Sequence, residues 1–270
     1  MTSTPQSPDL LAAIVAATLR GVATRAGEVP IAEIEHRAAK RDPRPGAFRS
    51  ALERGERCRI IAECKRRSPS RGMLRPDYDP AAIARGYDKA GAAAISVLTE
   101  PAFFDGSLDH LALVRGATAL PTLRKDFIVD PYQIVEARAA GADAILLIVA
   151  ALSRASLTLL HAKAVAAGLD VLVEVHDLLE IAAALDAGAT IIGVNNRNLR
   201  TLAVDVDVSH QAIELIPETI VAVAESGLKT GADVRRLRDA GYDAFLIGER
   251  FMTTHDPGAA LSELLESAEA

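Results

Sequence analysis

Tryptophan is absent from this chain, and the 270 positions include only two cysteines and 4% aromatic residues. Two cysteines, Cys58 and Cys64, are too few for a disulfide framework and favour a reducing compartment. No apolar run is long enough to span a bilayer. The run from Leu10 to Leu19 resembles the apolar part of a secretory signal, but Asp9 and largely polar residues precede it. We therefore expect a cytoplasmic protein that does not enter a membrane.

Charge and size set two further limits. The 30 basic and 36 acidic residues give a formal net charge of −6, which argues against nucleic acid or an anionic membrane as the main partner. Half of the residues are apolar, and 270 residues are enough for one large domain with a deep core. We expect a monomer or a weak homodimer.

A repeated pattern of helix ends and strands follows Cys58. Predicted helices end in the pair Ala-Gly, whose glycine can adopt a left-handed conformation, at glycines 91, 141, 168, 188 and 241. An apolar run follows each glycine and reads as a strand. Helix starts carry an N-cap acid before a proline, at Asp79-Pro80, Asp130-Pro131 and Asp256-Pro257. The pattern predicts strands that alternate with helices.

The strand that starts at Cys58 and the apolar runs at 121–125 and 219–224 bring the five strands to eight within about 210 residues. Eight alternating strands predict a (β/α)8 barrel, or TIM barrel, over residues 58–270. An open doubly wound sheet is the alternative, but no Gly-x-Gly-x-x-Gly fingerprint follows the first strand. Residues 1–57 form a separate helical extension, with helices expected at Leu10–Arg25, Ile31–Lys40 and Phe48–Arg54. We expect this extension to pack on the barrel and cover one end of it, so that the whole chain forms one structural domain.

The stretch from Cys58 to Gly72 changes abruptly from an apolar strand to charged residues. Side chains alternate along a strand, so Glu63 and Lys65 share a face with Ile61. An internal ion pair that closes the core is one interpretation. A barrel favours another, because chemistry in this fold sits where the strands end.

Charged, polar or small residues follow several other predicted strands. They are Lys125, Glu174, Asn195 with Arg197, Glu225 with Ser226 and Gly227, and Gly248. A single one of these could be structural, but together they predict an active site at one rim of the barrel. Gly227 and Gly248 follow the seventh and eighth predicted strands, at 219–224 and 244–247, and there is room for a short extra helix over 249–254. Together these features predict a phosphate site there.

The remaining histidines and cysteines add little to this site. The six histidines show no metal-ligand spacing, so we predict no metal. His176 shares a face with Glu174 but is interpreted as a loop histidine beside the predicted Asp177 N-cap. Cys64 alternates away from Glu63 and should face the helices as part of the core.

Six sequence motifs carry a family resemblance. They are IIAECKRRSPS at 60–70, LRKDF at 123–127, LVEVHD at 172–177, NNRNL at 195–199, AESGLKT at 224–230 and FLIGERFM at 245–252. Together they resemble the indole-3-glycerol phosphate synthase family from about residue 54 to the end. The resemblance implies a (β/α)8 barrel that closes the ring of a carboxyphenylamino-deoxyribulose phosphate, with loss of carbon dioxide and water. It implies no cofactor and a small phosphorylated substrate.

The resemblance also implies residue roles. Lys125 would be the general acid, and Glu174 would stabilise positive charge on the ring nitrogen. Glu63 and Lys65 would serve the dehydration step; which lysine and which glutamate act in which step stays open. The other residues implied to act in catalysis or substrate binding are Asn195, Ser226, Ser68, Phe127, Arg197, Leu199, Glu225, Gly227 and Gly248. Glu249 stands where many relatives have a small hydroxyl residue, and we expect it to point away from the phosphate.

Two alternatives remain. A phosphoribosylanthranilate isomerase-like barrel would need a cysteine base facing the pocket from strand one, where this chain has Glu63 and Lys65. A non-catalytic barrel that binds phosphorylated metabolites would need neither Lys125 nor Glu174.

Overall fold

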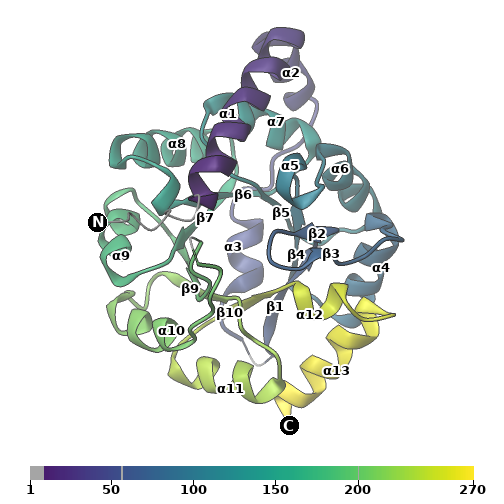
Figure 1. Ribbon diagram of the computed structural model, residues 1–270, viewed down its shortest axis with the longest axis vertical. Helices are drawn as coiled ribbons and strands as arrows, with labels where there is room; N and C mark the ends of the chain where they lie inside the picture. The colour runs from purple at the N-terminus through teal and green to yellow at the C-terminus, as the bar shows by residue number, and fades with distance from the viewer. Residues whose placement is uncertain (1–8, 56, 200) are drawn as a thin grey trace, which may run out of the picture.

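Eight short parallel strands close into a barrel (Figure 1) in the computed structural model, which describes residues 9–55, 57–199 and 201–270. The strands are β1 (Arg59–Cys64), β4 (Ala94–Leu98), β5 (Thr122–Lys125), β6 (Ala144–Ile148), β7 (Asp170–Val175), β8 (Ile191–Asn195), β9 (Val221–Glu225) and β10 (Ala244–Ile247). Each pairs with the next in chain order, and β1 closes the ring by pairing with β10. The predicted (β/α)8 barrel is confirmed and the open sheet is excluded.

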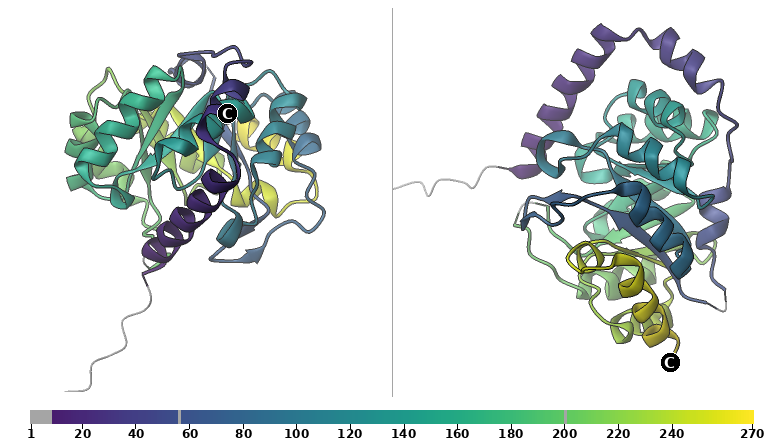
Figure 2. Two further views of the ribbon diagram at one scale, coloured as in Figure 1. Left: turned by 90° about the horizontal axis from the view of Figure 1, so that it is seen from above. Right: turned by 90° about the vertical axis from the view of Figure 1, so that its right-hand side faces the viewer.

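Helices between the strands form the outer layer of the barrel (Figures 1 and 2). They are α4 (Pro80–Ala90), α6 (Leu108–Ala117), α7 (Pro131–Ala140), α8 (Arg154–Ala166), α9 (Leu178–Asp186), α10 (Asp207–Ala212), α11 (Gly231–Ala240) and α13 (Pro257–Glu269). The side chains of Asp79, Asp130 and Asp256 accept hydrogen bonds from the first turns of α4, α7 and α13, as predicted. Because Gly91 and Gly141 adopt left-handed conformations after α4 and α7, the predicted helix ends are also confirmed there.

Short elements occupy the loops after several strands. The loop after β1 contains a two-stranded hairpin of β2 (Arg67–Ser68) and β3 (Gly72–Met73). The others are the helices α5 (Pro101–Phe104) and α12 (Glu249–Met252) and the 3₁₀ turn η1 (Val149–Ala151). A second 3₁₀ turn, η2 (Ile213–Leu215), instead follows α10 and leads into β9. Helix α12 is the extra turn that the sequence left room for after the last strand.

Alternation along the strands separates two apolar cores. Ile61, Leu123 and Leu172 face the inside of the barrel and pack in one cluster. Their chain neighbours face the helices and pack in another cluster, which includes Ile60 and Cys64. Since Ile61 faces inward, Glu63 on the same strand face is directed toward the barrel mouth.

The N-terminal extension reaches both ends of the barrel (Figure 2). Helix α3 (Ala47–Leu52) closes the end where the strands begin: Phe48 and Leu52 are fully buried in the inner cluster. The backbone N–H of Phe48 donates to Asp170 at the start of β7, at 2.9 Å. Helix α1 (Leu10–Glu28) instead contacts α5 and η1, which follow the C-terminal ends of strands. The expectation that the extension covers one end was therefore wrong, because the eight-residue helix α2 (Ile31–Ala38) and its linkers lead the chain along α7 from one end to the other.

The expectation that no apolar run is long enough to span a bilayer does not hold for helix α1, which by length and composition alone could cross a membrane. Its apolar residues have another partner in this structure. Ile14 is buried in the inner cluster, and Val22 is buried against Tyr132 of α7. These contacts bury one side of α1, while most of the helix stays exposed or half-buried, Leu19 among the exposed residues.

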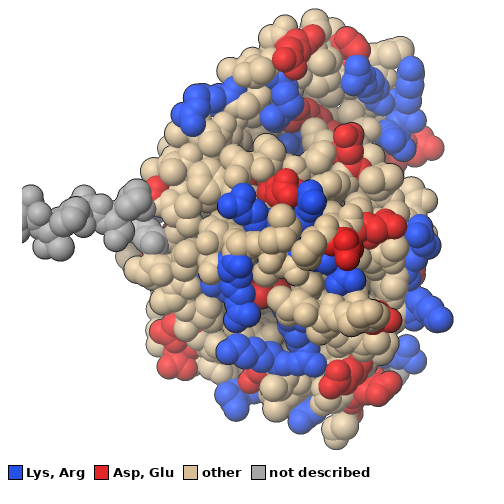
Figure 3. Space-filling model, turned by 45° about the vertical axis from the view of Figure 1, so that its right-hand side comes forward, with Lys and Arg blue, Asp and Glu red and all other residues tan. Residues whose placement is uncertain are grey.

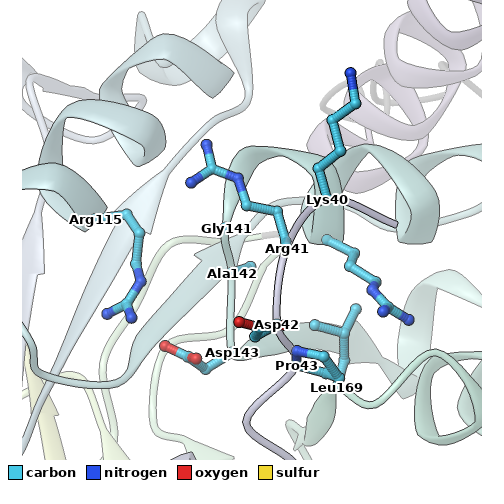
Figure 4. Close-up of a pocket in the computed structure, with 10 residues that line it drawn as sticks. Lys40, Arg41, Asp42, Pro43, Arg115, Gly141, Ala142, Asp143 and Leu169 are labelled. Carbon is cyan, nitrogen blue, oxygen red and sulfur yellow. The ribbon is translucent and has the colours of Figure 1, made fainter. Parts of the chain in front are cut away.

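A crevice of about 300 Å³ between the extension and the barrel is lined by several basic side chains (Figure 4). Arg41 donates to the carbonyl of Ala139 in the last turn of α7, at 3.3 Å. Arg138 donates to the carbonyl of Ala167, at the end of α8, at 2.8 Å. Helix C-termini carry free carbonyls and partial negative charge, so cations are stabilised there. These contacts explain the basic lining of the crevice as a set of helix caps.

A buried ion network lies between β5, α7 and α1. Arg124 is 1% exposed and donates to Asp126, at 2.9 Å, while Glu136 lies 3.4 Å from the same guanidinium. Arg25 of α1 donates to the other oxygen of Glu136 at 2.6 Å. Each charge in this network has a partner of opposite sign, which offsets the cost of removing it from water.

We predict that Glu136→Ala lowers the free energy of unfolding by about 3–5 kcal/mol, because it leaves the buried Arg124 with one fewer counter-charge. Urea denaturation followed by far-ultraviolet circular dichroism measures this. Asp186→Ala is the matched control, since it breaks an exposed ion pair with Arg154 and should cost less than about 1 kcal/mol. Similar losses in both variants would contradict this account of the network.

Candidate active site

A cavity of about 720 Å³ opens at the barrel end where the strands terminate. All thirteen residues that the sequence analysis assigned to the site line it: Glu63, Lys65, Ser68, Lys125, Phe127, Glu174, Asn195, Arg197, Leu199, Glu225, Ser226, Gly227 and Gly248. They come from the ends of six strands and the loops after them. The barrel thus brings together residues that are up to 185 positions apart (Glu63 to Gly248).

A cation between two carboxylates forms the centre of the cavity. The ammonium nitrogen of Lys125 donates to Glu174 Oε2 at 2.9 Å and lies 3.3 Å from Glu225 Oε2. Both carboxylates are 1% exposed, and the lysine side chain is 13% exposed. The three groups come from β5, β7 and β9, which end at the same level of the barrel.

These three groups shift one another's proton affinity. Burial opposes a charge on Lys125, but the carboxylates of Glu174, Glu225 and Glu63 outweigh it and raise the pKa of Lys125 above its ordinary value. Burial also opposes ionisation of Glu174, but Lys125 and His176 outweigh it and hold the pKa of Glu174 well below its ordinary value. For Glu225, burial and the neighbouring Glu174 dominate and raise the pKa to about 8. At neutral pH the centre therefore contains one ammonium, one carboxylate and one neutral carboxylic acid.

A second ion pair joins Glu63 and Lys65 at the end of β1. The carboxylate of Glu63 lies against Gly248, where an added Cβ atom would clash with its Oε1. Gly193 of β8 leaves similar room for Glu225. Larger residues at these two glycines would displace the carboxylates, so the glycines are part of what shapes the site.

Strands β8 and β9 supply polar groups through irregular backbone. Asn195 Oδ1 accepts a hydrogen bond from the backbone N–H of Arg197 at 3.0 Å, and Arg197 donates to the carbonyl of Leu202 at 3.2 Å. Ser226 has φ of 65° and Gly227 has φ of 81°, both in the left-handed region. A non-glycine residue in this region is uncommon and is often found at functional sites.

We expected Glu249 to point away from the phosphate, but the structure turns it toward two arginines at the cavity. It lines the cavity, and its carboxylate lies 2.9 Å from Arg71 Nε and 3.6 Å from Arg197 Nη2. Arg71 belongs to the loop after β1 and Arg197 to the loop after β8. The two arginines reach Glu249 through the geometry of their loops, which the strand pattern of the sequence does not indicate.

His176 contacts the central carboxylate, which our interpretation as a loop histidine did not include. Asp177 does cap α9, since its carboxylate accepts from the backbone of Leu179 at 2.9 Å. His176 Nε2, however, lies 3.1 Å from Glu174 Oε1. The sequence signal for this contact was the shared strand face of residues 174 and 176.

Sequence reasoning missed one apolar wall of the cavity. Leu10, Leu11 and Ile14 of α1 line it together with Phe104 of α5. The ring of Phe104 packs 6.2 Å from that of Phe127, centroid to centroid. The unpaired apolar start of α1 was the one available signal, but it did not indicate which part of the barrel it would contact.

Cys64 lies on the opposite face of β1, as predicted. It is fully buried among the residues between strands and helices, and burial raises the pKa of its thiol. The strand therefore presents Glu63 to the cavity and keeps the cysteine away from it.

Comparisons with known proteins agree with this site. The family model for indole-3-glycerol phosphate synthase matches residues 11–264. A relative of that name from Koribacter versatilis (strain Ellin345) is 50% identical over 257 residues, which cover 94% of this chain and 98% of the relative. Another of that name, from Laribacter hongkongensis (strain HLHK9), is 48% identical over 261 residues, which cover 95% of this chain and 98% of the relative.

Solved structures that are more distant in sequence share the barrel. Thiamine phosphate pyrophosphorylase from Pyrococcus furiosus has a TM-score of 0.60 at 19% identity, covering 79% of this chain and 96% of its own. A mandelate oxidase structure with (S)-2-phenylpropionate has a TM-score of 0.62 at 18% identity, covering 88% of this chain and 92% of its own. These likenesses concern the fold alone. The match over residues 11–264 and the identities of 50% and 48% show more: the chain belongs to the indole-3-glycerol phosphate synthase family.

Proposed function

We propose that this cavity closes the indole ring of carboxyphenylamino-deoxyribulose phosphate, with Lys125 as the general acid. In the reaction a ring carbon of the anthranilate bonds to the ketone carbon, carbon dioxide leaves that ring carbon, and the hydroxyl formed from the ketone leaves as water. The product is indole-3-glycerol phosphate, an intermediate of tryptophan biosynthesis. The observation that carries the proposal is the Lys125 ammonium held between Glu174 and Glu225 inside the cavity.

Lys125 donates the proton that the ketone oxygen needs as the carbon–carbon bond forms. Hydrogen-bonding to Glu174 fixes the ammonium in a largely buried site, where a positioned acid contributes more than it would in water. Glu174 stays ionised and stabilises the positive charge that develops on the anilino nitrogen.

Glu63 and Lys65 serve the dehydration half of the reaction. Their ion pair provides one group that can donate a proton and one that can accept it at the end of β1. Arg197 has the planar fork that suits the substrate carboxylate, and Asn195 holds the backbone of Arg197 in place. In this assignment Glu63 and Lys65 act after decarboxylation, whereas Lys125 and Glu174 act before it.

The two ends of the substrate meet different walls. The phosphate is bound by backbone N–H groups at Gly227 and Gly248, with Ser68 and Ser226 beside them in the cavity lining. The anthranilate ring packs on Phe127 and Leu199 and on the apolar wall from α1. Because Glu249 neutralises Arg71 and Arg197 at the rim, the substrate's own anionic groups compete with it for these arginines.

The alternatives fit this cavity less well. An isomerase of the same pathway needs a cysteine base in the pocket, and Cys64 is buried on the other face of β1. A barrel that only binds phosphorylated metabolites has no need for Lys125 between two carboxylates, since that cluster is costly to bury. Family membership favours the synthase over both.

We further infer that the protein works in the cytoplasm as a monomer or a weak homodimer, without a metal or organic cofactor, and that the extension and barrel act as one domain. Lys and Arg are interspersed with Asp and Glu over the face shown in Figure 3, rather than gathered into one patch that would suit nucleic acid or an anionic membrane. The net charge of −6 supports the same inference.

We expect Lys125→Met to lower kcat by a factor of about 10²–10⁴, the usual contribution of a positioned acid. The product's indole fluorescence measures the rate against a background without tryptophan. Lys163→Met, at an exposed position of α8, is the control and should behave as wild type. Near-normal turnover of Lys125→Met, with a normal circular dichroism spectrum, would rule out the acid assignment.

We also predict that kcat falls as the pH rises through about 8, the pKa of Glu225. Below this pH Glu225 is neutral; above it, a second negative charge next to Lys125 raises the pKa of Lys125 further and makes it a weaker acid. Glu225→Gln cannot ionise and should lose this decline. A profile of kcat against pH for both proteins tests the prediction, and an identical alkaline decline in the variant would contradict it.

A further inference from the structure

His176 is a buried imidazole that the proposed mechanism does not use. It follows β7 directly, and its side chain is 10% exposed. On one side Nε2 lies 3.1 Å from Glu174 Oε1, and on the other Nδ1 lies 3.8 Å from Glu180 Oε2. The ring is therefore placed between a carboxylate of the active site and a carboxylate of α9.

We propose that His176 is a positioning residue that holds Oε1 of Glu174. The other oxygen, Oε2, is thereby directed toward Lys125 and the substrate nitrogen. Glu180 in turn holds His176. The proposal deepens the function assigned to Glu174 and rests on it. His176 itself does not line the cavity. It acts on the reaction through Glu174.

The two oxygens of Glu174 have different partners. Oε2 accepts from Lys125 at 2.9 Å, whereas Oε1 lies next to His176. The last torsion of a glutamate side chain has broad, roughly two-fold minima, so a single contact would leave the carboxylate plane loosely defined. Contacts on both oxygens, from Lys125 and from His176, restrict that plane.

Glu180 ties this arrangement to the start of α9. Its Oε2 accepts a hydrogen bond from the backbone N–H of His176 at 2.6 Å, in addition to its proximity to the ring. Asp177, between them, caps the same helix through Leu179 and Glu180. The first turn of α9 thus sets the backbone from which His176 reaches Glu174.

The charges around His176 favour its cationic form. Burial opposes the charge, but Glu174 from β7 and Glu180 from α9 outweigh it and raise the pKa of His176 to about 9. A cationic imidazole has an N–H on both nitrogens, so each nitrogen can face a carboxylate. The contact of Nε2 with Glu174, at 3.1 Å, is the shorter of the two, and that of Nδ1 with Glu180 is 3.8 Å. Among the described residues, these two glutamates are the charged groups that shift the pKa of His176.

Steady-state kinetics of His176→Phe and His176→Gln test the proposal. We expect kcat of His176→Phe to fall by about tenfold or more, as for a group displaced from its productive geometry. KM should change by less than about twofold, because His176 does not touch the substrate. His176→Gln should recover part of the loss, since its amide can donate to Glu174. His161→Gln, at a buried histidine of α8 outside the cavity, is the matched control and should keep the wild-type kcat.

The pH dependence separates positioning from a merely structural role. In His176→Gln, Glu174 loses a cationic neighbour, its pKa rises, and the acid limb of the kcat profile moves to higher pH. An unchanged acid limb, or equal kcat values for the Phe and Gln variants, would overturn the proposal.

A nuclear magnetic resonance titration of the His176 ring tests its contact with Glu174 independently of catalysis. The ring should titrate near pH 9 in the wild type and at lower pH in Glu174→Gln. Absence of indole product from the wild type would refute the proposed function, whereas an unaltered His176 titration in Glu174→Gln would refute the contact alone.

Discussion

The ammonium of Lys125 between two buried carboxylates is the constraint on which the rest of the site depends. An ammonium within 3.3 Å of two carboxylates, all three largely buried, is stable only in particular protonation states. Lys125 and Glu174 satisfy each other, and Glu225 is left to hold a proton. Positions 193 and 248 must then be glycine, because the carboxylates of Glu225 and Glu63 occupy the space that a Cβ would fill.

Stability comes from other parts of the barrel. The inner cluster is closed at the opposite end by Phe48 and Leu52, and the extension is fastened there through Asp170. The charges of Arg124, Asp126 and Glu136 are paired with one another, with Arg124 and Glu136 outside the cavity and Asp126 at its lining. This separation lets the mouth contain an imperfectly satisfied carboxylic acid, since the energy that holds the fold together does not depend on it.

The strand faces and helix ends of the barrel were predictable from the sequence because they depend on local rules. Strand alternation placed Ile61 and Glu63 inward and Cys64 outward, and Asp-Pro and Ala-Gly pairs marked the helix ends. The contacts of Glu249 with arginines from two other loops were not predictable, because loop geometry decides which side chains meet. The path of the extension from one end of the barrel to the other was not predictable for the same reason. The predicted roles of the site residues remain proposals, since geometry brings the residues together without assigning steps to them.

The pair Arg124 and Lys125 illustrates how one strand divides the two tasks. Both are cations, adjacent in sequence at the end of β5. The strand's period of two sends Arg124 outward, where Asp126 and Glu136 pair it in a site that is 1% exposed. Lys125 faces the cavity, where its partners are also the groups that a substrate would meet. Exchanging the two residues would keep the composition and the net charge, yet it would put arginine's rigid fork where a proton must leave, and arginine does not release protons in proteins. The chemistry of this rim is therefore decided by which face of the strand each cation occupies.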